Sequence, residues 1–111
     1  MRVSFAKTFH FSASHEKNGK VYGHNYALTI TTDSMTDAQE TVFENTIKER
    51  FIDQIHTKDL GLHVDFLRSI DISDEKLLKI FFQIIEKLIC PAKLCSLSLK
   101  RDDRTEVTLA L

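Results

Sequence analysis

The chain has 111 residues, of which 42% are hydrophobic and 28% charged, and its formal net charge is −1. This length suits one domain, spanning residues 1–111, with a core of its own. The balanced charge argues against binding to nucleic acid or a membrane surface, which needs a cationic patch, and no apolar run approaches the roughly 20 residues of a membrane span.

The N-terminal stretch MRVSFAKTFHF alternates polar and apolar side chains and lacks the apolar block of a signal peptide. We therefore interpret it as the first strand of the fold. Two cysteines, Cys90 and Cys95, are too few for a disulfide framework, and we interpret both as core or strand residues. These features predict a cytoplasmic protein in a reducing environment.

The first part of the chain predicts an antiparallel hairpin. Apolar side chains alternate over residues 3–15 and again over residues 22–32, and the polar stretch EKNGK at residues 16–20 predicts the turn between them. His15 continues the apolar row of the first strand, and His24 lies within the apolar row of the second.

A helix is predicted over about residues 36–55. Thr36 and Gln39 have the spacing of a capping box, and the apolar residues behind them recur at helical spacing. The apolar positions of this helix are Ala38, Val42, Phe43, Ile47, Phe51, Ile52 and Ile55.

A second helix is predicted behind Ser73, which can cap it, with apolar positions from Leu77 to Leu88. Pro91 is a stop signal just beyond it. Residues 56–72 have no clear period, and we expect them to be a connection that contains a short turn of helix.

Two further strands close the chain. Cys95, Leu97 and Leu99 form one alternating apolar row. Val107, Leu109 and Leu111 form the other, and the polar stretch RDDR predicts a tight turn between the two strands. The sequence therefore predicts an α+β fold in which a four-stranded antiparallel sheet carries two helices on one face, in the order ββααββ.

The hairpin brings two histidines into a pattern that suits a metal. If the turn is tight, His15 and His24 lie close together at one end of the same face. Paired neutral imidazoles are a common basis for a zinc or iron site, and Tyr22 is the nearest third donor on that face. The alternative is a pair of half-buried histidines whose hydrogen bonds are satisfied within the protein.

Two motifs resemble the family of 6-pyruvoyl-tetrahydropterin synthase and 6-carboxy-tetrahydropterin synthase. They are FHFSASH at residues 9–15 and YGHNY at residues 22–26, and the order of elements is similar to the family's tunnelling fold. The resemblance implies zinc held by His15 and His24, with Tyr22 in place of the family's third histidine. It also implies a pterin-type substrate such as dihydroneopterin triphosphate, whose side-chain oxygens the metal polarises.

The sequence departs from the family at its catalytic residues. The family's cysteine falls near Asn18, which cannot take a proton from a carbon acid. Its Asp-His pair aligns with His56 and Thr57, or, with a one-residue insertion, with Ile55 and His56. His56 is therefore the candidate catalytic residue, without its carboxylate partner; the alternative is a histidine that interacts with a helix C-terminus.

The substrate-binding residues also differ. The family's glutamate that anchors the pterin falls on Lys100 or Arg101, and a cation cannot accept a hydrogen bond from a pterin N–H group. An acid at the start of the family's second helix corresponds to Glu75, the candidate substrate-binding residue. The alternative role of Glu75 is to stabilise the helix N-terminus.

Three functions follow from these observations. The first is a divergent pterin synthase-like enzyme that uses His15, His24 and His56. The second is a catalytically inactive homologue that serves as a binding or assembly module, and the third is a structural module with incidental histidines.

The predicted sheet has two open edges, and no strand contains a proline that would block pairing. In the tunnelling fold, subunits join edge to edge into a closed barrel. We therefore expect a homo-oligomer, a trimer or a hexamer of two stacked trimers, in which a neighbouring chain contributes His56 to the site.

Overall fold

The computed structural model describes residues 3–17, 20–58 and 73–111, and of residues 15–17, 21 and 22 it describes the backbone alone. Most of the predicted connection over residues 56–72 thus lies outside the described residues. The elements are β1 (Ser4–Lys17), β2 (Lys20–Asp33), α1 (Asp37–Ile47), η1 (Lys48–Ile52), α2 (Asp53–Ile55), α3 (Asp74–Ile89), β3 (Leu94–Arg101) and β4 (Thr105–Ala110).

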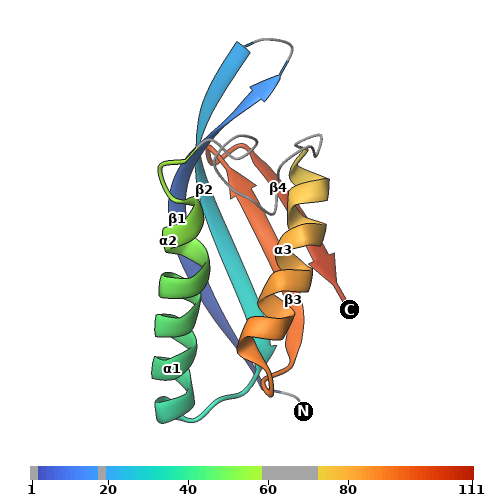
Figure 1. Ribbon diagram of the computed structural model, residues 1–111. Coiled ribbons are helices and arrows are strands. Elements are labelled where there is room, and N and C mark those ends of the chain that lie inside the picture. Colours follow the sequence, from blue (N-terminus) through green and yellow to red (C-terminus); the bar gives the residue numbers. More distant parts are fainter. Residues whose placement is uncertain (1–2, 18–19, 59–72) are drawn as a thin grey trace.

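The four strands form one antiparallel sheet in the order β1-β2-β3-β4. Both long helical segments, α1 to α2 and α3, lie against the same face of that sheet (Figure 1). The predicted fold class is therefore confirmed. In the described part of the chain, no helix has the length and apolar character that a membrane crossing requires.

Alternation along the strands explains which face is covered. Phe11, Tyr26 and Arg101 are cross-strand neighbours, and so are Phe9, Leu28 and Leu99. Partners in an antiparallel register share a face, so these rows look toward the helices. Within the core, the Phe11 ring stacks on Tyr26 at a centroid distance of 5.0 Å.

The β1–β2 hairpin is longer than predicted. Pairing continues through Glu16 and Val21 to Lys17 and Lys20, so most of the predicted turn at residues 16–20 is strand. The hydrogen bonds of the β-ladder join backbone groups and do not need apolar side chains. The alternating apolar pattern ends where the polar residues begin, so the pattern alone predicted a hairpin that is too short. The end of the hairpin projects beyond the helices (Figure 1).

The predicted helix over residues 36–55 is present, but with a wider turn inside it. Thr36 and Gln39 form the capping box, and five residues from Lys48 to Ile52 are π-helical. Buried residues fall on Phe43, Ile47, Phe51, Ile52 and Ile55, whereas Ala38 and Val42 are exposed. Two of the seven apolar positions of the helical pattern therefore lie beside the buried stripe rather than on it.

The second helix begins where predicted, since the Ser73 hydroxyl accepts a hydrogen bond from the N–H of Lys76. Beyond the helix, a bulge changes the expected row of β3. Thr31 pairs with Ser96 and Thr32 with Leu94, so Cys95 is the extra residue. Leu94 is therefore the buried residue, while Cys95 is half-buried.

Two predicted core residues outside the bulge are exposed. Cys90 ends α3 on the surface, which corrects its interpretation as a core or strand residue. Leu111 follows the last strand and is 81% exposed, because the sheet ends before it.

Candidate functional site

The three predicted metal ligands lie at nearby positions of the β1–β2 ladder. The backbone of His15 pairs with that of Tyr22, and two steps along the ladder, beyond the Ser14–Gly23 pair, Ala13 pairs with His24. Residues two apart on one strand share a face, so the three positions belong to the helix-facing side of the projecting hairpin end. The side chains of His15 and Tyr22 lie outside the described part, and their convergence with His24 stays a prediction.

His24 is held by a carboxylate from the other end of the chain. Its Nδ1 lies 2.5 Å from Oδ2 of Asp102, while Oδ1 of Asp102 accepts the N–H of Asn25 at 2.8 Å. These two hydrogen bonds keep the pKa of Asp102 below its usual range, so the carboxylate is ionised and can only accept. The proton between the two side chains therefore belongs to Nδ1 of His24, and in the neutral ring the lone pair is on Nε2.

His56 lies beside β1 of its own chain. It ends α2, and its Nδ1 accepts the N–H of Ser12 at 3.0 Å. The next two residues continue along the same strand: Thr57 N–H donates to the carbonyl of Ser12, and Ser14 N–H donates to the carbonyl of Lys58. The neutral His56 ring consequently carries its proton on Nε2, one position along the strand from the Ala13–His24 pair.

Glu75 lies in the first turn of α3 and forms an exposed ion pair with Lys79 at 3.1 Å. The adjacent acid, Asp74, is the one that faces the sheet: its side chain is only 15% exposed, and its Oδ2 lies 3.5 Å from Nε of Arg101. The substrate-binding role predicted for Glu75 is not tested by this arrangement.

The end of β3 carries cations on both faces. Arg101 lies opposite Tyr26 on the helix side and also approaches Thr105, with Nη2 3.4 Å from its hydroxyl. Lys100 lies opposite Ala27 on the other face. There it borders a polar hollow of about 260 Å³, whose lining also includes His10 and Asp103.

Tyr26 connects this region to the core. Its ring lies 5.8 Å from that of His24, the residue is 2% exposed, and its hydroxyl has no hydrogen-bond partner among the described residues. Burial and the negative charge of Asp74 raise the pKa of Tyr26. It therefore remains a neutral phenol at physiological pH and cannot serve as a phenolate ligand.

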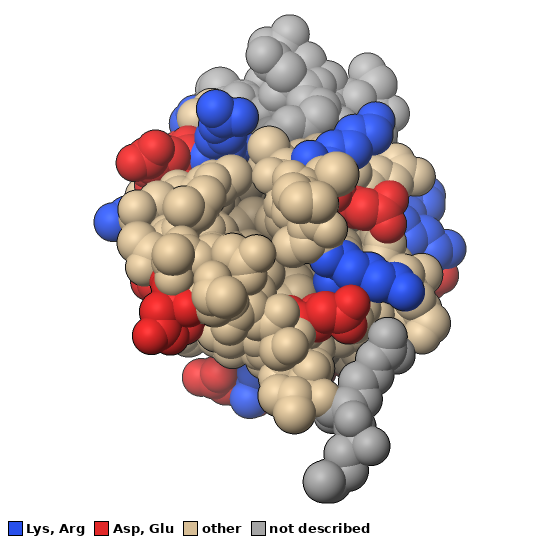
Figure 2. Space-filling view, turned by 90° about the horizontal axis from the view of Figure 1, so that it is seen from below, with Lys and Arg blue, Asp and Glu red and all other residues tan. Residues whose placement is uncertain are grey.

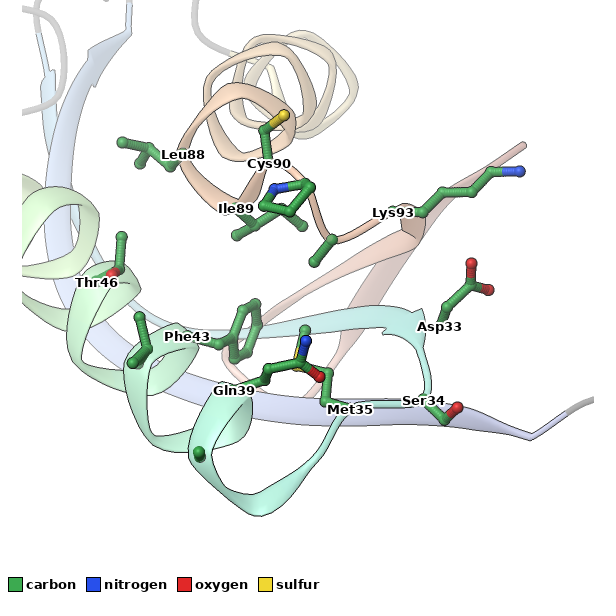
Figure 3. A pocket seen from close by; sticks show the side chains of 14 residues that line it. Asp33, Ser34, Met35, Gln39, Phe43, Thr46, Leu88, Ile89, Cys90 and Lys93 are labelled. Carbon is green, nitrogen blue, oxygen red and sulfur yellow. The ribbon is translucent and has the colours of Figure 1, made fainter.

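Another hollow lies away from these residues. It measures about 550 Å³ and lies between the first turns of α1 and the last turn of α3. Met35, Phe43 and Ile89 point into it, and the Cys90 thiol points away (Figure 3). Uncharged side chains cover much of this end of the molecule, with charges of both signs around them (Figure 2).

A smaller hollow, of about 400 Å³, adjoins the histidines. It is lined by residues of both strands of the hairpin, including Ser12, Ser14 and His24, and by Thr57. Because it combines polar side chains with a histidine whose tautomer is fixed, this hollow is the better candidate site, although it is the smaller of the two.

The donor chemistry fits a metal ion. Among the described side chains, no three His, Cys, Asp or Glu residues gather in one place, so a complete ligand set would need His15 and Tyr22. His24 itself meets the requirement, since metal-binding histidines usually donate their other ring N–H to a carboxylate or carbonyl. Neutral imidazole nitrogens are also the ligands that zinc prefers.

Asp102 is the functional residue that sequence reasoning missed. The stretch RDDR was correctly predicted to be a turn, and β3 and β4 indeed flank it. The contact of Asp102 with His24 depends on the register between β2 and β3, in which Tyr26 pairs with Arg101. A register of this kind cannot be obtained from two separate alternating patterns.

Comparisons with known proteins bear on the fold. No protein-family model matches the chain, and no curated protein matches it. Among solved structures, Caenorhabditis elegans 6-pyruvoyl tetrahydropterin synthase is similar, with a TM-score of 0.83 at 14% identity, over 100% of this chain and 99% of that one. An uncharacterised protein from Wolinella succinogenes is similar with a TM-score of 0.68 at 14% identity, over 99% and 98% of the two chains. The chain therefore has the fold of 6-pyruvoyl tetrahydropterin synthase.

Proposed function

We propose that this protein is a divergent relative of 6-pyruvoyl tetrahydropterin synthase that binds a metal ion and acts on a pterin-type substrate. The observation that carries the proposal is the hydrogen bond between His24 and Asp102, which prepares Nε2 of His24 as a ligand. The register of His15 and Tyr22 supports them as further ligands, and zinc is among the metals that imidazole ligands suit. The whole-chain likeness in fold supports the substrate class.

Each residue then has a defined task. Bound zinc would supply a Lewis acid for an oxygen of the substrate. Asp102 holds the His24 ring, and the hollow beside Ser12 and Thr57 admits the substrate. His56, fixed through Nδ1 by Ser12, can donate a proton from Nε2. For His56 to act as a base there, its proton must first move to Nδ1, at the expense of the hydrogen bond to Ser12.

The alternative is an inactive homologue that binds a ligand or assembles with other chains. It is favoured by the end of β3, where the resemblance puts the pterin-anchoring carboxylate at Lys100 or Arg101, both of which are cations. The main-chain hydrogen bond on Nδ1 of His56 also favours it, because a carboxylate at that nitrogen would make the ring more basic.

The test begins with zinc bound by the purified chain, using His24→Ala and the matched variant His10→Ala. His10 is on the same strand pair but opposite Ala27, on the face away from the helices. We expect one zinc ion per chain, lost in His24→Ala and kept in His10→Ala. A wild-type chain that binds no zinc would contradict the proposal.

The zinc-loaded chain is then given dihydroneopterin triphosphate. Release of triphosphate supports the enzyme. Binding without turnover supports an inactive homologue that binds a ligand. A chain that binds no pterin contradicts both the enzyme and a pterin-binding homologue, and leaves only the assembly module.

A further inference from the structure

We infer that Asp102 is a positioning residue whose carboxylate fixes His24 in the tautomer with the proton on Nδ1 and the coordinating lone pair on Nε2. The tautomer is a property of the protein by itself. Its consequence for metal affinity rests on the function proposed above.

The turn between β3 and β4 builds this arrangement from the backbone. Asp102 and Asp103 both have left-handed backbone angles, with φ of 51° and 57°, which Asp tolerates better than most residues. The Asp102 N–H donates to the carbonyl of Asn25 at 2.8 Å. This bond continues the β2–β3 pairing one step beyond Tyr26 and Arg101, and it brings the Asp102 side chain alongside His24.

The carboxylate then uses both of its oxygens. Oδ1 accepts the N–H of Asn25, and Oδ2 contacts Nδ1 of His24. Asp102 and Asn25 thus form a reciprocal pair of hydrogen bonds that orients the carboxylate independently of its contact with His24. Because the acceptor is charged and held at two points, the hydrogen bond to His24 is of the stronger, directional kind.

An amide at this position would have the opposite effect. In Asp102→Asn, one oxygen can still accept the N–H of Asn25, so the turn is kept. The remaining NH₂ group can only donate toward His24. It therefore favours Nδ1 as the acceptor and moves the proton to Nε2, the atom that would bind the metal.

The tautomer is measured by long-range ¹H–¹⁵N correlation spectra of the full chain at pH about 8.5, above the ordinary histidine pKa of about 6.5. A His24→Gln variant assigns the His24 signals. The matched control is Asp103→Asn, since Asp103 is the next residue of the same turn, is also left-handed, and is exposed at 93% of its side chain. Circular dichroism confirms that both variants are folded.

We expect the Nδ1–H tautomer in the wild type and in Asp103→Asn, and the Nε2–H tautomer in Asp102→Asn. Zinc titration should show affinity about 10- to 100-fold lower for Asp102→Asn, the range for loss of a histidine's carboxylate partner. A wild type in the Nε2–H form, or an unchanged tautomer in Asp102→Asn, would overturn the inference. So would equal zinc affinity of Asp102→Asn and wild type. If no variant binds zinc but the tautomers are as expected, the proposed function fails and the positioning role of Asp102 stands.

Discussion

Lys100 and Arg101 are neighbours on β3, so their side chains lie on opposite faces of the sheet. Arg101 is paired with Asp74. The ammonium group of Lys100 is 3.9 Å from Asp103, at the limit of an ion pair, and borders the 260 Å³ hollow. Asn25 lines both this hollow and the one beside Ser12 and Thr57. Lys100 is therefore the cation that a ligand reaching from one hollow into the other would meet, and a cation cannot accept a hydrogen bond from a pterin N–H group.

Lys100→Glu should increase the affinity for a pterin. The new carboxylate can accept from a pterin N–H group, and a hydrogen bond to a charged acceptor is worth about 1.5–3 kcal/mol, or roughly tenfold or more in affinity. Fluorescence titration with neopterin measures the change. Lys100→Gln is the control, since it removes the charge without adding a carboxylate. Equal affinity of Lys100→Glu and Lys100→Gln would show that this position does not contact the ring.

Tyr26→Phe should not destabilise the protein. The Tyr26 hydroxyl is buried without a partner in the described part of the chain, and an unsatisfied buried polar group costs about 1–3 kcal/mol. Removing it should leave the free energy of unfolding in urea unchanged or raise it by about 1 kcal/mol. Tyr26→Leu, the control, loses the stacking on Phe11 and should be less stable. A loss of more than about 1 kcal/mol in Tyr26→Phe would reveal a partner for the hydroxyl.

For single residues, the sequence identified candidate site residues but not the residues that contact them in the fold. Alternation was enough to place His15, Tyr22 and His24 on one face, as the register has it. The contacts of His24 with Asp102 and of His56 with Ser12 join residues far apart in the chain. They depend on sheet register and on where α2 ends, which short-range patterns do not contain.

The helices show which structural features a short-range sequence signal can predict. The capping box at Thr36 has both of its hydrogen bonds, from Gln39 N–H to the threonine hydroxyl and from Thr36 N–H to the glutamine side chain. Signals of this kind act within one turn and can be recognised in the sequence. They do not report the π-helical stretch at residues 48–52.

Thr36→Ala should lower the free energy of unfolding by about 1 kcal/mol, because it removes the side-chain cap of α1. Thr41→Ala is the matched control. Thr41 is exposed inside the same helix, and its hydroxyl only contacts the carbonyl of Asp37, so alanine should be neutral or slightly stabilising there. Urea denaturation of both variants measures the difference. Equal stability of the two would mean that tertiary packing alone defines the start of α1.

The existence and order of the elements and the capped starts of the two helices were predictable, whereas the extent of the hairpin and the bulge in β3 were not. Period 2 and period 3.6 separate strands from helices wherever one side is buried. The β1–β2 hairpin is longer than predicted because the polar residues 16, 17 and 20 also pair. In β3, the bulge at Cys95 puts Leu94 in the buried row in place of Cys95. A one-residue irregularity of this kind cannot be found from alternation alone.

In the described part of the chain, helices cover one face of the sheet and no helix lies against the other, which we call the uncovered face (Figure 1). On the uncovered face, small hydroxyl side chains pair with each other across the strands: Thr8 with Thr29 and Ser98 with Thr108, each at 2.8 Å. Part of the β1 edge is covered by Thr57 and Lys58, and β4 is the edge strand at the other side. The end of the β1–β2 hairpin projects past the helices of its own chain (Figure 1).

We expect further copies of the chain to pair with the edges of this sheet, in a trimer or a hexamer. Association of the sheets edge to edge would pair the outer strands and would bring a neighbouring subunit to the projecting hairpin. Light scattering at micromolar concentration should give a mass of three or six times 12.8 kDa. A mass of 12.8 kDa would refute the oligomer and any site shared between subunits.

The most direct test of the central claim is anomalous diffraction from a crystal of the full chain grown with zinc. We expect one anomalous peak per chain, beside His24 on the β1–β2 hairpin. That peak should lie about 2.0–2.1 Å from Nε2 of His24 and from a ring nitrogen of His15, with Asp102 still bonded to Nδ1 of His24. Imidazoles of His15 and His24 that point apart, or zinc bound elsewhere on the molecule, would contradict it.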